Sequence, residues 1–378
     1  MQISRIFAAL TAFVLMLPLC TVSAAADGEK SPQHTYASAL LEAESGMCIG
    51  GTDPDIPLPV GSQAKLMTVY LTARTVRAGE LTPETSVTAP QAVEKQQGAV
   101  IWLTPGEHMT VLDLLKGVII GNANDAAVTL ASRISGSEQA FVMEMNAAAS
   151  ALGMNRTHFA DCTGLSAENT ASAHDLALLC RALLEFDFLT PLLTTWRDFL
   201  RDGKTELVAE NTLTRTYEGI LGMKAGHGEP CGYTLAAAAE RGGLRMIAVI
   251  LGCDDKDERF TLGKRLLAGA FSDIYVTTPD FSAEFLRPVP VRLGLTGAVT
   301  AEPGALRAVA APKGREISCV VILPEYVEAP VRQGETIGTA AFYCGDTYVY
   351  ETPLTAAETV GKRHFADAAR LLLSNMFK

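Results

Sequence analysis

Closely spaced metal ligands are missing from this sequence. It contains no Cys-x-x-Cys and no His-Glu-x-x-His, and its six histidines are scattered over 378 residues. Zinc sites usually draw on such short spacings. The sequence therefore gives no support for a metal site, and we expect the protein to work without a metal or another cofactor.

Excess positive charge is also missing. Lys and Arg number 31 against 42 Asp and Glu, which gives a formal net charge of −11 at pH 7. Nucleic-acid binding depends on positive charge that neutralises phosphates, so this balance excludes nucleic acid as an expected partner. With 48% hydrophobic and 19% charged residues the chain has a globular composition, and its length suggests about two or three domains.

The apolar run near the N-terminus is too short for a comfortable transmembrane helix. It covers residues 6–19, whereas a spanning helix takes ~20 residues. Arg5 precedes the run and Ser23-Ala24-Ala25-Ala26 follows it, which is the pattern of a secretory signal peptide. We assign residues 1–26 to this signal and expect a secreted, extracytoplasmic protein. Leu19 argues against lipidation of Cys20, because a smaller residue is expected there.

The cysteines do not form an obvious disulfide framework. Removal of the signal takes away Cys20 and leaves seven of the eight, and an odd number cannot all pair within one chain. Most are interpreted as buried small hydrophobes. A bridge between Cys319 and Cys344 is the one pairing that we consider.

Periodicity and turn residues predict a first domain at residues 30–275. A hairpin is expected at 35–52, and helices are expected from Ser62 to Gly79 and at 110–120, 125–134 and 174–184. Strand-like runs at 234–238 and 244–251 flank Arg241-Gly242-Gly243 and predict an antiparallel hairpin.

Residues 276–360 are predicted to form a small β domain, because short strand-like runs at 289–293, 317–322 and 339–343 alternate with Pro and Gly. Residues 361–378 then place Phe365, Ala368, Leu372 and Met376 near helical spacing, with Lys and Arg around them. This amphipathic helix either lies on a membrane surface or packs on its own domain, and we weigh the two interpretations equally.

Ser62 and Lys65 form the only Ser-x-x-Lys in the chain. In a helix the two side chains lie one turn apart on the same face, near the positive helix end. A lysine can remove the serine proton if burial lowers its pKa, and Ser–Lys pairs are a known form of nucleophilic catalysis. About one such match is expected by chance in a chain of this length, so the pair needs support from elsewhere.

That support comes from the order of motifs. Ser62-x-x-Lys65 is followed by Asn122-Ala123-Asn124 between two predicted helices, and then by Lys224-Ala225-Gly226 just before the strand hairpin. This order resembles the serine penicillin-binding protein and β-lactamase superfamily, whose signature is Ser-x-x-Lys, Ser-x-Asn and Lys-Thr-Gly. The sequence is more similar still to the low-molecular-weight D-alanyl-D-alanine carboxypeptidases of the peptidase S11 type. The similarity extends over nearly the whole mature chain and includes GAVIWLTPGE at 98–107, NRTHFADCTGL at 155–165 and the run 329–338.

The resemblance implies a fold and a reaction. The fold class is α/β (α+β): a transpeptidase/β-lactamase-like domain with an antiparallel sheet flanked by helices, followed by a small C-terminal all-β domain. The reaction is removal of the terminal D-alanine from peptidoglycan stem peptides through an acyl-enzyme at Ser62. β-Lactams are then expected to act as covalent inhibitors.

The resemblance also implies a role for each site residue. Ser62 is the expected nucleophile and Lys65 its base, while Asn124 aligns the lysine amine and the substrate amide. Lys224 adds positive potential and helps to hold the loop of Asn122. The strand Ala225-Gly226-His227 lines the substrate, and the backbone N–H groups of Ser62 and His227 form an oxyanion hole worth ~3–4 kcal/mol per donor. Arg259 is expected to bind the terminal carboxylate of the substrate.

Two residues depart from the family signature. Asn122 stands where the family has the serine of Ser-x-Asn, and a carboxamide relays a proton less readily than a hydroxyl. Ala225 stands where the family has the threonine of Lys-Thr-Gly, and losing one hydrogen bond to a charged group costs ~1.5–3 kcal/mol. Two other functions therefore stay open: a weakly active or inactive homologue that binds or organises the cell wall, and a β-lactamase. The second is disfavoured by the extra β domain and by the absence of a recognisable carboxylate motif, since Glu168 is interpreted as a loop residue.

Overall fold

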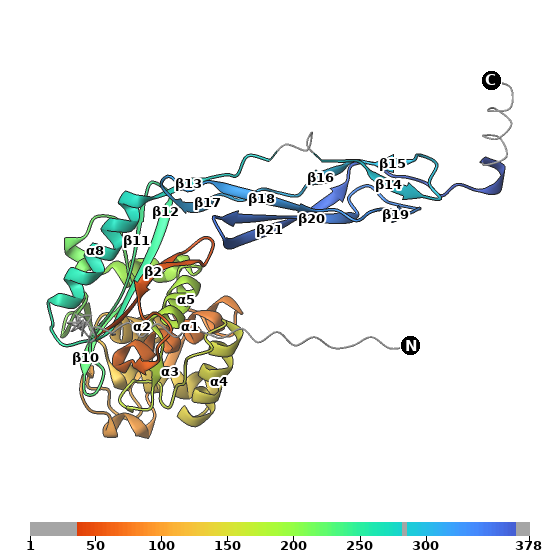
Figure 1. The fold of residues 1–378 in the computed structure, drawn as a ribbon. Coiled ribbons are helices and arrows are strands. Elements are labelled where there is room, and N and C mark those ends of the chain that lie inside the picture. The colour runs from red at the N-terminus through yellow and green to blue at the C-terminus, as the bar shows by residue number, and fades with distance from the viewer. Residues whose placement is uncertain (1–35, 282–285, 368–378) are drawn as a thin grey trace, which may run out of the picture. The chain divides into compact units, whose positions relative to one another are not determined.

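The computed structural model describes residues 36–281 and 286–367 (Figure 1). The part from residue 36 to residue 273 is built on one antiparallel sheet of order β10-β11-β12-β1-β2, with β9 paired to β11. The strands are β1 (Ala37–Glu42), β2 (Cys48–Thr52), β9 (Ile220–Gly222), β10 (Ala225–Gly228), β11 (Gly232–Arg241) and β12 (Leu244–Cys253). The first strand therefore pairs with β12, from the far end of this part of the chain.

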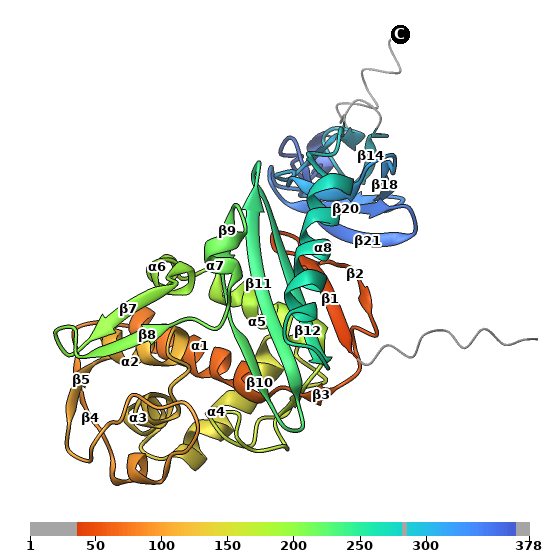
Figure 2. The same ribbon diagram turned by 90° about the vertical axis from the view of Figure 1, so that its left-hand side faces the viewer.

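Both faces of the sheet are buried. Along β11, Leu235 and Ala237 belong to one hydrophobic cluster and Ala236 and Ala238 to another, as the alternation of side chains along a strand requires. The first cluster includes the apolar face of α8 (Glu258–Asp273), and the second includes that of α5 (Ala173–Leu183). Figure 2 shows α8 running along the sheet. An antiparallel sheet flanked by helices is thus formed, as predicted.

Most of the remaining helices contribute to the second cluster and form a helical subdomain. They are α1 (Ala64–Arg77), α2 (Val111–Ile119), α3 (Asn124–Ser135), α4 (Glu138–Ala151) and α6 (Thr190–Thr194), with 3-10 turns η1 (Gly61–Gln63), η2 (Gln91–Lys95) and η3 (Asp187–Leu189). The short helix α7 (Leu213–Thr216) contributes Leu213 to the first cluster. Side chains of Thr110, Ser137 and Ser172 accept backbone N–H groups and so cap α2, α4 and α5. Helix α1 is buried on nearly all sides of its first half, so it lies at the centre of this subdomain.

Short strand pairs connect these helices. They are β3 (Leu58–Pro59) with β6 (Thr170–Ala171), β4 (Ser86–Thr88) with β5 (His108–Thr110), and β7 (Arg197–Leu200) with β8 (Thr205–Val208). The pair β3–β6 brings the loop after residue 155 beside the start of α1. This contact matters for the site, because the two segments form one wall of it.

The predicted hairpins at 35–52 and 234–251 are confirmed, as are the helices expected at 110–120, 125–134 and 174–184. The α-helix expected to begin at Ser62 begins at Ala64 instead, and Ser62 lies in the preceding 3-10 turn η1. Gly61, at a φ of +51°, sets this turn. The helices α4 and α8 were not predicted.

The C-terminal part is all β, as predicted. Its strands are β13 (Ile274–Thr277), β14 (Val289–Arg292), β15 (Ala298–Val299), β16 (Ala301–Pro303), β17 (Val309–Pro312), β18 (Ile317–Ile322), β19 (Val327–Glu328), β20 (Thr336–Cys344) and β21 (Thr347–Ala356). They pair as β13-β17, β15-β14-β19 and β16-β21-β20-β18. Val289, Phe342 and Leu354 lie in the core, where the rings of Phe342 and Tyr350 stack with centroids 4.7 Å apart.

The considered bridge between Cys319 and Cys344 is wrong. All seven cysteines of the described residues are free thiols. In the β18–β20 register Cys319 lies opposite Phe342 and Cys344 opposite Ile317, so the two thiols are offset along the strands. Most of the helix expected at 361–378, including Ala368, Leu372 and Met376, lies outside the described residues. Within those residues, no helix has the length and apolar character needed to cross a membrane.

Candidate active site

Ser62 lies in η1, immediately before α1, at the bottom of a cavity of about 320 Å³. Gly164 packs against the backbone of this turn: a Cβ at Gly164 would lie 3.0 Å from the Ser62 nitrogen. On the other side, strand β10 passes so close that a Cβ at Gly226 would lie 2.8 Å from the Ser62 Cβ. Two glycines thus allow backbone segments to close around the serine.

Lys65 is buried in the first turn of α1 and lines the same cavity. Its Nζ donates to the Thr163 carbonyl oxygen at 2.6 Å. Burial lowers the pKa of Lys65 to about 8, although Cys162, Asp161 and Glu210 act in the opposite direction. A lysine with this pKa is partly neutral near pH 7 and is able to accept a proton from the nearby serine.

Lys224, just before β10, is also buried, and its Nζ donates to the Val118 carbonyl oxygen at 3.0 Å. Val118 is in the last turn of α2, which leads into the loop that carries Asn122, so the contact ties β10 to this loop. Burial and then the charge of Lys65 hold the pKa of Lys224 well below its usual range. For Lys65, burial is the cause that lowers the pKa.

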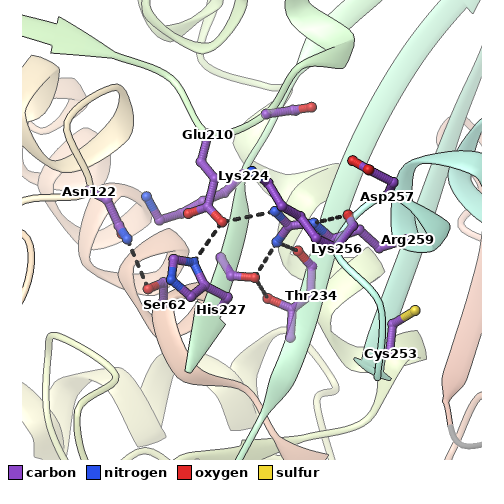
Figure 3. A network of polar contacts seen from close by, with 12 residues as sticks. Ser62, Asn122, Glu210, Lys224, His227, Thr234, Cys253, Lys256, Asp257 and Arg259 are labelled. Carbon is purple, nitrogen blue, oxygen red and sulfur yellow. Dashed lines mark hydrogen bonds and ion pairs between the residues drawn. The ribbon is translucent and has the colours of Figure 1, made fainter. Parts of the chain in front are cut away.

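Asn122 contacts Ser62 directly. Its Nδ2 donates to Ser62 Oγ at 3.1 Å, and its backbone has a φ of +57°, a region that asparagine tolerates better than most residues (Figure 3). An N–H donor stabilises negative charge that develops on the serine oxygen. It does not accept and pass on a proton as a hydroxyl does. The departure from the family signature is therefore a change in chemistry at the reacting oxygen.

Asn124 is the first residue of α3 and lines the cavity. Its Nδ2 donates to the Gln97 carbonyl oxygen at 2.6 Å, and its Oδ1 is buried without a partner in the described part of the chain. Among the hydrogen bonds of the described residues there is none between Asn124 and Lys65. The free Oδ1 is able to accept a hydrogen bond from a donor in the cavity.

Arg259, at the start of α8, is packed behind the cavity and is not part of its lining. Its side chain is 0% exposed, and its NH1 donates to the carbonyl oxygens of Gly226 and Thr234. Its NH2 donates to Glu210 Oε1 at 2.9 Å, and the same oxygen lies 2.9 Å from Nδ1 of His227 (Figure 3). Ala225 is buried and presents only a methyl group beside these residues.

Two residues of the site were not predicted from the sequence. Glu210 belongs to no motif and reaches the site from the loop between β8 and α7. Asp161 organises the wall opposite β10, because it accepts the backbone N–H groups of Thr163, Gly164 and Ser166. Burial opposes its ionisation, but these bonds prevail and lower the pKa of Asp161. The sequence could have pointed to Asp161, because it lies inside the family-like stretch 155–165. No feature of the sequence pointed to Glu210.

The cavity has the features of an acyl-transfer site. Its walls are the turn η1, the loops at 98–99 and 163–167, the Asn122–Asn124 segment and the segment 227–231. Glu168 is exposed in a turn and does not line the cavity. No cluster of three or more His, Cys, Asp or Glu side chains that could hold a metal occurs among residues 36–281 and 286–367.

Comparison with known proteins places this geometry in a family. The model of the D-alanyl-D-alanine carboxypeptidase family matches residues 25–255, and that of the penicillin-binding protein 5 C-terminal domain matches residues 308–362. The chain is similar to D-alanyl-D-alanine carboxypeptidase DacF of Bacillus subtilis, with 31% identity over 350 residues and 90% of each chain covered. It is 28% identical to DacC of Escherichia coli over 377 residues, covering 96% of this chain and 93% of that one.

Solved structures agree on the fold. Penicillin-binding protein 5 of Haemophilus influenzae superposes with a TM-score of 0.76 at 24% identity, covering 86% of this chain and 97% of that one. Penicillin-binding protein D2 of Listeria monocytogenes, in its cefotaxime-bound form, has a TM-score of 0.56 at 28% identity. That match covers 62% of this chain and 96% of the other.

Proposed function

Since the chain belongs to the D-alanyl-D-alanine carboxypeptidase family, a family of serine peptidases, we propose that it removes the terminal D-alanine from peptidoglycan stem peptides through an acyl-enzyme at Ser62. The observation that carries the proposal is the arrangement around Ser62. The serine lies in a cavity with a buried lysine of lowered pKa, an amide donor on its oxygen, and strand β10 beside it.

The proposed first step is acylation. Neutral Lys65 accepts the Ser62 proton as Oγ attacks the carbonyl carbon of the penultimate D-alanine. The backbone N–H groups of Ser62 and His227 stabilise the negative charge on the carbonyl oxygen. The Lys65 ammonium then returns a proton to the departing nitrogen, and D-alanine leaves with its amine restored.

The second step is hydrolysis of the ester. Lys65, neutral again, takes a proton from a water molecule whose oxygen attacks the acyl carbon. The Ser62 oxygen leaves and is reprotonated, which releases the shortened peptide as a carboxylic acid. Asn122 Nδ2 supports the serine oxygen in both steps, because it donates to this atom and does not compete for the Lys65 amine.

The proposal extends to location and inhibition. The signal-peptide pattern at 1–26 supports action outside the cytoplasm, where peptidoglycan is found. β-Lactams are expected to acylate Ser62, and the relative D2 of Listeria monocytogenes has been solved in ampicillin- and cefotaxime-bound forms. Association with the outer face of the cytoplasmic membrane through residues 361–378 is part of the proposal and is tested below.

The decisive experiment is mass spectrometry of the purified protein after exposure to a β-lactam. The mass of the drug should appear on the Ser62 peptide, and Ser62→Ala should abolish it. Labelling of another residue, or none at saturating drug, contradicts the mechanism.

A second candidate, a weakly active homologue with a binding role in the cell wall, is favoured by Asn122 and Ala225. Turnover of a D-Ala-D-Ala peptide, absent in Ser62→Ala, would exclude it. Rapid hydrolysis of penicillin would instead favour a β-lactamase.

A further inference from the structure

Most of the N–H donors of the Arg259 guanidinium are used within the protein: four of its five form hydrogen bonds. Nε donates to the Lys256 carbonyl oxygen, NH1 donates to two carbonyl oxygens of the sheet, and NH2 donates to Glu210. The Arg259 side chain is fully buried, and Glu210 is the partly exposed member of the ion pair. A free carboxylate on a substrate therefore meets a cation that already has a carboxylate partner.

Glu210 lies between this cation and the cavity. Its Oε1 contacts both Arg259 NH2 and His227 Nδ1, and the His227 side chain, 64% exposed, lines the cavity with Ser62 (Figure 3). The Glu210 side chain itself is 24% exposed. Burial opposes its ionisation, but the contacts with Arg259 and His227 prevail and lower the pKa of Glu210. Glu210 is thus an anion at neutral pH and is partly exposed to solvent.

The neighbouring side chains of the sheet, Ala225 and Thr234, provide no positive charge and no free hydrogen-bond donor in place of Arg259. Ala225 contributes a buried methyl group to this part of β10, and the Thr234 hydroxyl donates to the Gly226 carbonyl oxygen at 3.3 Å. The Gln63 amide also donates to Thr234 Oγ1. Arg259 and Glu210 form an ion pair, so the guanidinium attracts a carboxylate less strongly than an unpaired cation in the same place would.

We infer that Glu210 sets the substrate selectivity of the Ser62 site. It pairs with the Arg259 guanidinium, which would otherwise bind a free carboxylate on the leaving group. The inference rests on the proposed function and names its substrate class. The site accepts D-alanyl peptides whose leaving residue carries no free carboxylate, because that residue is amidated or extended through a further peptide bond. The reaction is the same hydrolysis, with the departing amine taking the proton from Lys65.

Two peptides that differ only at the C-terminus test this. One is an N-acylated peptide ending in D-Ala-D-Ala with a free carboxylate, and the other is its C-terminal carboxamide. We expect kcat/KM of the wild-type protein for the two to agree within about tenfold, since one hydrogen bond to a charged group is worth about that factor or more. If turnover is too slow to measure, each peptide is tested for its ability to protect Ser62 from a fluorescent penicillin. The ratio of the two peptide affinities then replaces the ratio of kcat/KM.

Glu210→Gln keeps an acceptor for Arg259 but removes the negative charge. We expect it to shift the ratio toward the carboxylate peptide by roughly 10- to 100-fold, which is the usual size of a charge-assisted interaction. Glu210→Asp keeps the charge and should keep the wild-type ratio. Glu206→Gln is the matched control, because Glu206 pairs with Arg197 on the exposed β7–β8 hairpin, away from the cavity lining.

The outcomes separate the two proposals. If Ser62 is labelled and the wild-type ratio is measurable, but Glu210→Gln changes it less than about twofold, the inference is overturned and the proposed function stands. A wild-type preference for the carboxylate above about 100-fold overturns it even if Glu210→Gln does not fold. If neither peptide is cleaved and Ser62 takes up no penicillin, the proposed function itself fails.

Discussion

The role of Lys65 as the base gives the sharpest prediction, because it links burial to a measurable pH dependence. Only the neutral amine accepts the Ser62 proton. Burial lowers the pKa of Lys65 from 10.5 to about 8. At pH 7 a lysine with this pKa is about one-tenth neutral, and an ordinary lysine only ~0.03%, so burial raises the reactive fraction ~300-fold.

The rate of acylation should follow this fraction. Lys65 loses its proton as the pH rises, so the second-order rate constant for labelling by a fluorescent penicillin should increase about tenfold between pH 6 and 7 and level off above about pH 8. In Lys65→Arg the guanidinium stays protonated, and we expect a loss of at least about 10³-fold. Lys116→Arg is the matched control, because Lys116 pairs with Asp198 on the surface of α2.

Two results would refute the reasoning. A rate constant that does not change across this pH range would mean that another group takes the proton. Lys65→Arg acylation within about tenfold of wild type, in a variant with unchanged thermal stability, would mean that the charge of residue 65 is irrelevant to the step.

Three further predictions concern other parts of the molecule. If Asn122 and Ala225 limit the rate, Asn122→Ser and Ala225→Thr should raise turnover of a D-Ala-D-Ala peptide, singly or together, in a D-alanine release assay; unchanged or lower turnover would show that the site has its own compensated geometry. Gly226→Ala should cut acylation at least about 10²-fold, because the added Cβ would lie 2.8 Å from the Ser62 Cβ and push β10 away from the serine; normal labelling in a variant with wild-type thermal stability would contradict this. The mature protein should co-sediment with anionic liposomes at low salt, and a form ending at Val360 should not; if both stay in the supernatant, the packed-helix interpretation of residues 361–378 is preferred.

Local patterns predicted much of the fold. The hairpin that joins Arg241 to Leu244 was predicted from a Gly-Gly turn between apolar strands. Helix α2 was predicted from an apolar run that follows Thr110. Helix α8 was missed because its apolar face is interrupted by charged residues and is recognised only from the sheet that it covers. Helix α1 begins two residues later than predicted, because Gly61 and the close approach of Gly164 impose a 3-10 turn on Ser62.

Some residues of the site were predictable from the sequence and others were not. Residues with motif spacing, such as Ser62, Lys65 and Lys224, were found from the order of motifs, and the structure brings them together. Glu210 was not found, since its partners are far away in the chain: the fold brings it to His227 and Arg259 through the loop after β8. A carboxylate without a motif has no local signal, and only the tertiary contacts reveal that it neutralises a buried cation.

Ala225 and Glu210 both lie in the part of the site near Arg259, where the leaving group is expected. Asn122 contacts Ser62 itself, but Lys65 and the backbone around Ser62 keep what acylation needs. Decay of an inactive enzyme would be expected to disturb the nucleophile and its base as readily as the leaving-group side. Because Ser62 and Lys65 are kept while the leaving-group side is altered, we predict a separation of activities. Acylation by a β-lactam should depend on Lys65 and little on Glu210, while the choice between peptides with and without a free carboxylate should depend on Glu210.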